Sequence, residues 1–174
     1  MCSIPKAIIV VSYPGSPWFS DCMTSLQGVQ YPIVVCWNLP ENNAYDAAGL
    51  YLAQELGIEE FFLLHDSTLV KDVQFINEAM KQPGCIALAP GGLMLMGKYS
   101  LADMPPLPPR PVGKRAAIEV ELSYKNQVPW RGVLEPSMND GPVREMKHGQ
   151  ERMRIEGDNI IKWKYHYDMS KVTD

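Results

Sequence analysis

The chain has 174 residues, a hydrophobic fraction of 46% and a formal net charge of −4. This length is typical of one domain with a sizeable core, and the apolar content argues against long-range disorder. Acidic and basic residues are spread along the whole chain, which argues against a sequence-independent nucleic-acid binder, because such a protein needs a basic face.

The sequence gives no sign of a membrane or secreted protein. No apolar run reaches the roughly 18 residues that a membrane span needs. The start, "MCSIPKAIIVV", lacks a basic region and a small-residue cleavage site. No cysteines form a C-x-x-C pair, and Cys22, Cys36 and Cys85 lie in apolar surroundings that predict buried thiols. We therefore expect a cytoplasmic protein.

Strands and helices alternate in the first half of the chain. Apolar, β-branched runs predict strands covered on both faces at residues 6–13, 31–38, 59–65 and 85–90. Between them, helices are predicted over 16–28, 43–57 and 69–84. Ser16 and Asn43 are the expected N-caps, and Tyr45, Ala48, Leu52 and Leu56 form the expected apolar stripe of the second helix. This order predicts an α/β fold whose mainly parallel central sheet has helices on both faces.

The second half is less regular. The prolines between Pro105 and Pro111 exclude a helix or a central strand there. Residues 115–126 fit a helix or a strand equally well. Residues 151–168 alternate polar and apolar side chains around "GDN", which predicts a C-terminal β-hairpin.

Polar residues follow the predicted strands at their carboxyl ends, where parallel sheets bind ligands. His65 and Asp66 end the run "FFLLHDST". Asp66 could bind a divalent cation that holds a diphosphate, or it could cap a helix beginning near Leu69. His65 could be a metal ligand, a contact to a base or sugar, or a half-buried strand residue.

Three further residues are candidates. Glu119 and Glu121 could act as general bases; on a helix they point about 200° apart, so only one could enter a site. His166 could join Asp66 in a Mn²⁺ or Mg²⁺ site if its strand reaches the same edge, and otherwise is structural.

Known signatures of other enzyme classes do not occur. The first loop, "SYPGSPW", has neither the glycine spacing nor the lysine of a Walker loop. The chain also lacks the Rossmann G-x-G-x-x-G and the G-x-S-x-G of α/β-hydrolases.

Taken together, residues 6–101 resemble a small GT-A-type glycosyltransferase, similar to the family-2 nucleotide-sugar transferases. The segments that carry the resemblance are "VVSYPGSP", "IVVCWN", "ENNAYDAAGLYLAQELG", "FFLLHDST" with a D-x-D-like triplet, and "GGLMLMGKYSL". Within the single domain over 1–174 that the length predicts, the resemblance implies a nucleotide-sugar-binding half at 6–101 and an acceptor-side segment, including the Pro-rich loop, at 102–174.

The resemblance also implies roles for the candidate residues. These are Tyr13 and Pro14 beside the nucleobase, Asn38 or Glu41 at its edge, His65 and Asp66 at the diphosphate, Glu119 or Glu121 as the base, and Asp66 and His166 as ligands of Mn²⁺ or Mg²⁺. The implied reaction moves a sugar from a nucleotide diphosphate-sugar donor to an acceptor hydroxyl. The acceptor could be a lipid, a glycan, a protein or a modified DNA base.

Other functions remain open at this point. A histidine stands where the D-x-D triplet has its first acid, so the chain could be a nucleotide- or glycan-binding module without turnover. A nucleotidyltransferase would use the same general sheet. The Pro-rich segment and "LMLM" could pack against a second subunit, so a homo-oligomer is possible.

Overall fold

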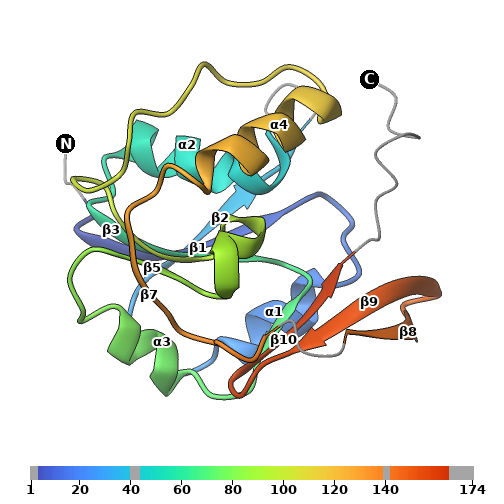
Figure 1. Ribbon diagram of the computed structural model, residues 1–174. Coiled ribbons are helices and arrows are strands. Elements are labelled where there is room, and N and C mark those ends of the chain that lie inside the picture. Colours follow the sequence, from blue (N-terminus) through green and yellow to red (C-terminus); the bar gives the residue numbers. More distant parts are fainter. Residues whose placement is uncertain (1–3, 40–43, 139–141, 165–174) are drawn as a thin grey trace.

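The protein is described here by a computed structural model, which places residues 4–39, 44–138 and 142–164. Its larger sheet has the order β2-β1-β3-β6-β5-β7 (Figure 1). The strands of this sheet are β1 (Lys6–Ser12), β2 (Ile33–Trp37), β3 (Glu60–His65), β5 (Cys85–Ala87), β6 (Gly97–Ser100) and β7 (Trp130–Val133). Its described strands are parallel to one another except β6, which is antiparallel to both of its neighbours.

A second, antiparallel sheet has the order β4-β10-β9-β8. Its strands are β4 (Thr68–Val70), β8 (Val143–Lys147), β9 (Gln150–Glu156) and β10 (Ile160–Lys164). The pair β9–β10 confirms the predicted C-terminal hairpin, and β10 pairs on its other side with β4, which directly follows β3.

Helices cover both faces of the larger sheet, as predicted. They are α1 (Phe19–Ser25), the 3₁₀ helix η2 (Tyr45–Ala47), α2 (Ala48–Leu56), α3 (Gln74–Ala79), the 3₁₀ helix η3 (Pro90–Leu95) and α4 (Lys114–Tyr124). In Figure 1, α2 and α4 lie above the sheet, and α1 and α3 lie below it. No helix in the described ranges has the length and apolar character needed to cross a membrane.

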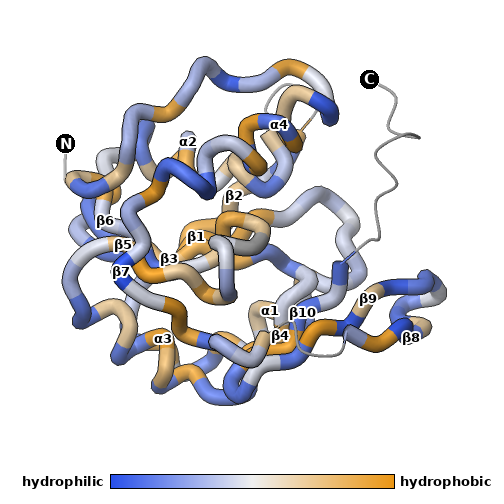
Figure 2. Tube along the Cα trace, in the orientation of Figure 1, coloured by the Kyte–Doolittle hydropathy of each residue, from blue (hydrophilic) through white to orange (hydrophobic). Residues whose placement is uncertain are grey.

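Alternation along the central strands divides the core into two layers. Side chains of Ala7, Ile9 and Val11 pack towards α2, whereas Ile8 and Val10 pack towards α1 and α3. Figure 2 shows the resulting apolar stretches along β1 and β3 at the centre of the molecule. A strand buried on both faces needs such a continuous apolar run, which explains why the sequence locates β1 and β3 correctly.

The prediction of the second helix is only partly correct. The expected stripe included Leu56, but this side chain is 47% exposed. The buried face instead contains Ala47, Leu50 and Tyr51, and Gly57 ends the helix with a φ of 63°. Apolar residues occur on more than one face of this helix, so the sequence allowed two different apolar stripes. Packing against β1 and β3 buries the stripe that contains Leu50 and Tyr51 and leaves Leu56 exposed.

The predicted helix over 69–84 is too long. Leu69 and Val70 belong to β4 and pair with Ile161 and Ile160 of β10. The helix α3 begins only at Gln74. Short apolar runs fit either a strand or a buried helical turn. Residues 68–70 form a strand because they pair with β10, which is distant in the sequence.

The structure also shows the conformation of residues 115–126, of the Pro-rich segment and of the cysteines. The segment over 115–126 is helical in α4, and the described prolines from Pro105 to Pro111 lie outside helices and strands. Cys22, Cys36 and Cys85 are free, buried thiols, as predicted. Burial raises the pKa of Cys22 to about 12 and that of Cys36 to about 11, so both remain protonated.

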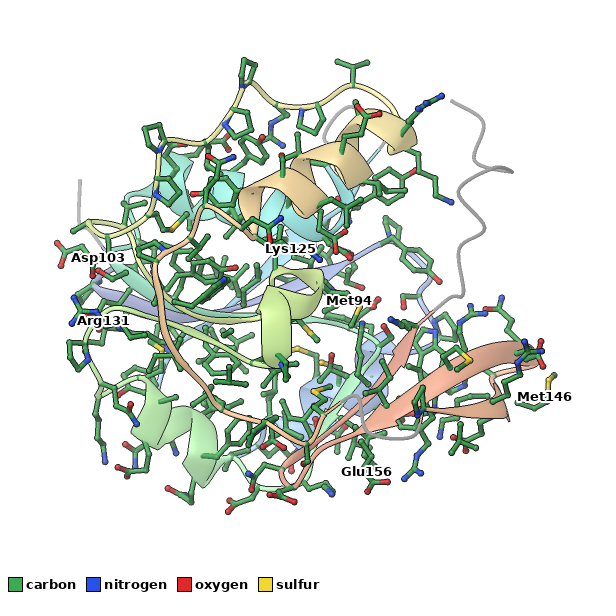
Figure 3. The ribbon with its side chains drawn as sticks, in the orientation of Figure 1. Met94, Asp103, Lys125, Arg131, Met146 and Glu156 are labelled. Atoms are coloured by element: carbon green, nitrogen blue, oxygen red, sulfur yellow. The ribbon has the colours of Figure 1, made fainter. Side chains whose placement is uncertain are left out.

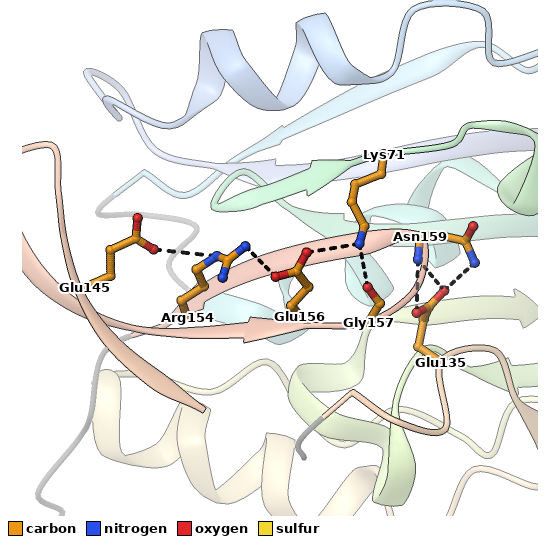
Figure 4. A network of polar contacts seen from close by, with 7 residues as sticks. All are labelled: Lys71, Glu135, Glu145, Arg154, Glu156, Gly157 and Asn159. Atoms are coloured by element: carbon orange, nitrogen blue, oxygen red, sulfur yellow. Dashed lines mark hydrogen bonds and ion pairs between the residues drawn. The ribbon is translucent and has the colours of Figure 1, made fainter. Parts of the chain in front are cut away.

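Glu135, just after β7, fixes the turn between β9 and β10 (Figure 4). This carboxylate is buried and accepts hydrogen bonds from the backbone N–H and the side-chain amide of Asn159, the latter at 2.7 Å. In the same network Lys71 pairs with Glu156 and donates to the Gly157 carbonyl. The second sheet is therefore tied to the end of the first.

Candidate functional site

A cavity of about 260 Å³ lies where the carboxyl ends of β1 and β3 meet the second sheet. From β1 the chain passes through α1 to β2 on one side, and β3 then lies on the other side of β1. This reversal of strand order is the topological switch point, where ligands bind in open α/β sheets. The structure thus puts the cavity at the edge that the sequence predicted.

Asp66 lines this cavity and is held in place on both sides. Its backbone N–H donates to the Val11 carbonyl at 2.9 Å, and its Oδ2 accepts a hydrogen bond from Ser12 Oγ at 2.8 Å. The alternative role of Asp66 as a helix cap is wrong, because the segment that follows is β4. The carboxylate of Asp72, not Asp66, accepts from the Gln74 N–H at the start of α3.

Lys162 of β10 faces Asp66 from the second sheet, and the sequence did not single it out. The side chain is 3% exposed, and its Nζ donates to Ser67 Oγ at 2.5 Å. The Trp163 N–H donates to the Ser67 carbonyl at 2.9 Å, which fixes the strand beside the turn. Burial lowers the pKa of Lys162, while Asp46 and Asp66 act in the opposite direction.

His65 is almost fully buried at the end of β3. Its Nδ1 lies 3.5 Å from Asp46 Oδ1. Among the described residues its buried Nε2 has no hydrogen-bond partner. Burial lowers the pKa of His65 to about 4 in spite of Asp46, so the ring is neutral near pH 7. The cavity-lining imidazole can therefore offer its second nitrogen to a ligand.

Asp46 joins His65 to the helix α4. Glu121 makes a side-chain hydrogen bond with Asp46, and burial together with this carboxyl group raises the pKa of Glu121 to about 8. Near neutral pH Glu121 is therefore mostly protonated. Glu119, the other predicted base, is 65% exposed and pairs with Arg115 on the outer face of the helix, so the structure does not bring it to the cavity.

Aromatic side chains form one wall of the cavity. The rings of Trp18 and Trp163 lie 5.4 Å apart with an angle of 32° between their planes. Tyr13 and Tyr45 line the opening, and Tyr13 is 44% exposed, so its ring is available to a flat ligand. Met94, labelled in Figure 3, reaches the same cavity from η3.

Asn38 lines the cavity at the carboxyl end of β2. Its Nδ2 donates to the Tyr45 carbonyl at 3.3 Å, whereas its buried Oδ1 accepts no hydrogen bond from the described residues. The geometry leaves this oxygen for an N–H donor. Pro14 is exposed and is not among the cavity-lining residues, and Glu41 lies outside the described residues.

The ionic side chains that line the cavity favour an anion. Arg152, Lys162 and Lys164 come from the second sheet, and Asp46 and Asp66 come from the edge of the first. With His65 neutral, the cations outnumber the carboxylates. Cations together with carboxylates suit a ligand that carries both a phosphate group and hydroxyl or N–H groups.

The described residues do not fit a divalent cation. No three His, Cys, Asp or Glu side chains within the described ranges lie together as ligands. The Asp66 carboxylate already accepts from Ser12, and the ammonium group of Lys162 shares its surroundings. His166, the second predicted ligand, lies outside the described residues.

Sequence reasoning missed three of the residues that build the site. Lys162 sits in "IIKWK", where its alternation with apolar residues is that of an exposed strand position. Asp46 and Arg152 carry no motif at all. The signal that could have found Asp46 is its place at the start of the helix that follows the second strand, because helix starts face the carboxyl edge of a parallel sheet.

Comparison of the chain with protein-family models, with curated proteins and with solved structures gives no match.

Proposed function

We propose that this protein transfers a sugar from a nucleotide diphosphate-sugar donor to an acceptor hydroxyl. The observation that carries the proposal is the cavity at the switch point. It brings together an aromatic wall, a cationic side, Asp46 with its hydrogen bond to Glu121, and the atoms Asn38 Oδ1 and His65 Nε2, which have no partner among the described residues. This set of groups offers a partner for each part of a nucleotide sugar: the base, the diphosphate and the reacting hydroxyl. The resemblance to GT-A-type transferases points to the same chemistry.

The nucleoside would lie along β1 and β2. Tyr13 offers an exposed ring for stacking on the base, and Asn38 Oδ1 offers an acceptor for an N–H group on its edge. Each of the common nucleobases carries an N–H group that could donate to this oxygen, so the contact does not by itself select the base. The diphosphate then extends toward Lys162, Lys164 and Arg152 on the second sheet.

The transfer step needs a proton acceptor near the sugar. The oxygen of the acceptor hydroxyl attacks the anomeric carbon and forms a new C–O bond. The bond from that carbon to the donor phosphate breaks, and its electron pair stays on the phosphate oxygen. The hydroxyl proton passes to the Asp46–Glu121 pair, in which Asp46 lines the cavity. A positioned base of this kind contributes about 10²–10⁴-fold.

A thermal-shift panel of nucleoside diphosphates and nucleotide sugars tests the proposal. A ligand at about 100 times its dissociation constant adds about 2.7 kcal/mol to the free energy of unfolding. For this chain length, that corresponds to a rise of roughly 5–10 °C in Tm. We expect at least one nucleoside diphosphate in the panel to give such a rise, and Asn38→Ala to reduce it.

Two results would change the assignment. A panel without any shift, on protein shown to be folded, would contradict nucleotide binding altogether. Binding of a nucleotide sugar without transfer or donor hydrolysis, over a wide range of acceptors, would favour a binding module, for which the same cavity would serve.

A further inference from the structure

We infer that the ammonium group of Lys162 binds the diphosphate of the ligand and that this binding requires no divalent cation. The inference rests on the proposed function, since it takes the ligand to carry a diphosphate. It departs from the metal-assisted mechanism that the D-x-D-like triplet suggests, because the residue that the structure puts beside this triplet is a lysine.

The position of Lys162 is fixed from two sides. Its strand pairs with β4 through Thr68 and with β9 through Ile155, so the side chain points to the turn that carries Asp66 and Ser67. The hydrogen bond from Nζ to Ser67 Oγ, at 2.5 Å, holds the ammonium group beside the triplet. An ammonium group has three N–H donors, and this contact uses one of them.

The surroundings favour the charged form of this lysine once an anion is present. Burial lowers the pKa of Lys162, and the opposing groups are Asp46 from η2, Asp66 from the turn after β3, Cys22 from α1 and Glu121 from α4. A bound diphosphate adds negative charge at the same place and acts in the same direction as these carboxylates. Ligand binding and protonation of Lys162 therefore support each other.

The cationic side chains of the cavity disfavour a divalent cation. A metal between the triplet and the diphosphate would have to lie close to Lys162, with Lys164 and Arg152 lining the same cavity. Like charges within a poorly solvated site repel strongly. The carboxylate of Asp66 is then oriented by its hydrogen bond from Ser12 and supports the charge of the nearby ammonium group, rather than binding a metal.

In the transfer step, the departing nucleoside diphosphate gains negative charge on the oxygen that leaves the anomeric carbon. A fixed cation beside this oxygen lowers the barrier without any reorganisation at the moment of reaction. Lys162 would supply that cation from the protein itself, and its N–H groups not used by Ser67 would donate to the phosphate oxygens.

The test is isothermal titration of the full chain with uridine diphosphate, guanosine diphosphate and inorganic pyrophosphate, each in EDTA and again with Mg²⁺ or Mn²⁺. Wild-type protein should bind pyrophosphate and one of the nucleoside diphosphates in EDTA, with a Kd that metal changes by less than about twofold. Lys162→Met should weaken both by about 10–100-fold, which is the range for a lost hydrogen bond to a charged group. Lys81→Met is the matched control, because Lys81 is exposed just beyond α3, pairs with Glu78 and does not line the cavity. It should bind as the wild type does.

The outcomes separate this inference from the proposed function. Binding by wild-type protein only when metal is added would overturn the lysine site and leave nucleotide-sugar transfer standing. Metal-free binding that Lys162→Met does not weaken would also overturn it. Pyrophosphate binding in EDTA that depends on Lys162, without turnover of any nucleotide sugar, would support the lysine site and count against the transferase. No binding of any probe in either condition would overturn both. The wild-type comparison of EDTA with metal decides the point even if Lys162→Met does not fold.

Discussion

At the scale of single residues, burial of His65 determines the protonation state of its ring. The ring is nearly enclosed, its Nδ1 faces Asp46, and its Nε2 meets no described partner. An imidazole in this position is kept neutral, and it can donate or accept one hydrogen bond inside the cavity without adding a charge. The site can then bind an anion mainly through the cations of the second sheet.

The free energy of unfolding should fall between about pH 6.5 and pH 4 because of His65. Burial lowers the folded-state pKa to about 4, so the unfolded chain takes up a proton at a higher pH than the native protein does. The stability is present above the unfolded-state pKa and is lost as pH falls. A shift of this size corresponds to about 3 kcal/mol. Urea unfolding of wild type and His65→Gln, at several pH values in this range, measures it. Parallel curves for the two proteins would contradict the burial of His65.

The pair of Asp46 and Glu121 should change the free energy of unfolding with pH in the direction opposite to His65. Burial and the neighbouring carboxyl group raise the pKa of Glu121 to about 8, so its contribution is present below about pH 4.5 and is lost as pH rises toward 8. Asp46→Asn removes the negative charge beside Glu121. We expect the pKa of Glu121 in this variant to move toward that of an ordinary carboxyl group. Carbon-detected NMR titration measures the change, with Glu119 as an exposed internal reference. An unchanged Glu121 titration would show that the two groups do not interact.

At the scale of elements, the β9–β10 turn positions Lys162. Gly157 lies in this turn against Glu135, and a Cβ at Gly157 would overlap the Glu135 carboxylate. Gly157→Ala must therefore displace either the turn or the carboxylate, which also holds Asn159. We expect a loss of about 1–3 kcal/mol in the free energy of unfolding. Weaker pyrophosphate binding should accompany it, because β10 shifts.

Gly132→Ala is the control for this variant. A Cβ at Gly132 would lie 3.9 Å from Ile86 Cγ2, which is an ordinary contact. Chemical unfolding of the two variants side by side gives the comparison. Equal stability of Gly157→Ala and Gly132→Ala would mean that the contact between Glu135 and the turn does not hold the second sheet.

Elements with strong local signals could be predicted from the sequence, and those defined by distant partners could not. Continuous apolar runs located β1 and β3, and alternation around "GDN" located the hairpin of β9 and β10. The strand β4 was assigned to a helix, because only its pairing with β10 makes it a strand. The antiparallel strand β6 was missed for a similar reason: "GKYS" is short and carries no period of its own.

At the scale of the whole molecule, the site is shared between two sheets. The larger sheet brings Asp66, His65 and Asn38 to its carboxyl edge, as the order of strands predicted. The cationic side comes from the second sheet, whose strands β9 and β10 lie more than 80 residues further along the chain than β3. Only the pairing of β4 with β10 brings Lys162 to Asp66, and no local pattern encodes this pairing. The sequence could therefore predict one side of the cavity and not the other.

This arrangement predicts where a ligand protects the backbone. A bound nucleoside diphosphate bridges the two sheets, so exchange of the Asp66 and Trp163 amide protons, which donate to Val11 and Ser67, should slow. Amides of α3, on the underside of the sheet and away from the cavity, should be unaffected. Hydrogen-exchange mass spectrometry with and without uridine or guanosine diphosphate measures this. Protection confined to α3, or none at saturation, would place the ligand elsewhere.

The most direct test of the central claim is release of nucleoside diphosphate from a panel of nucleotide sugars, with wild-type protein and with Asp46→Asn. We expect one nucleotide sugar in the panel to be consumed, with release slowed about 10²-fold or more in the variant, since a positioned proton acceptor is lost. Thermal unfolding of the variant shows whether it is folded. Tight binding of a donor without release, or equal release by both proteins, would contradict transfer at this cavity.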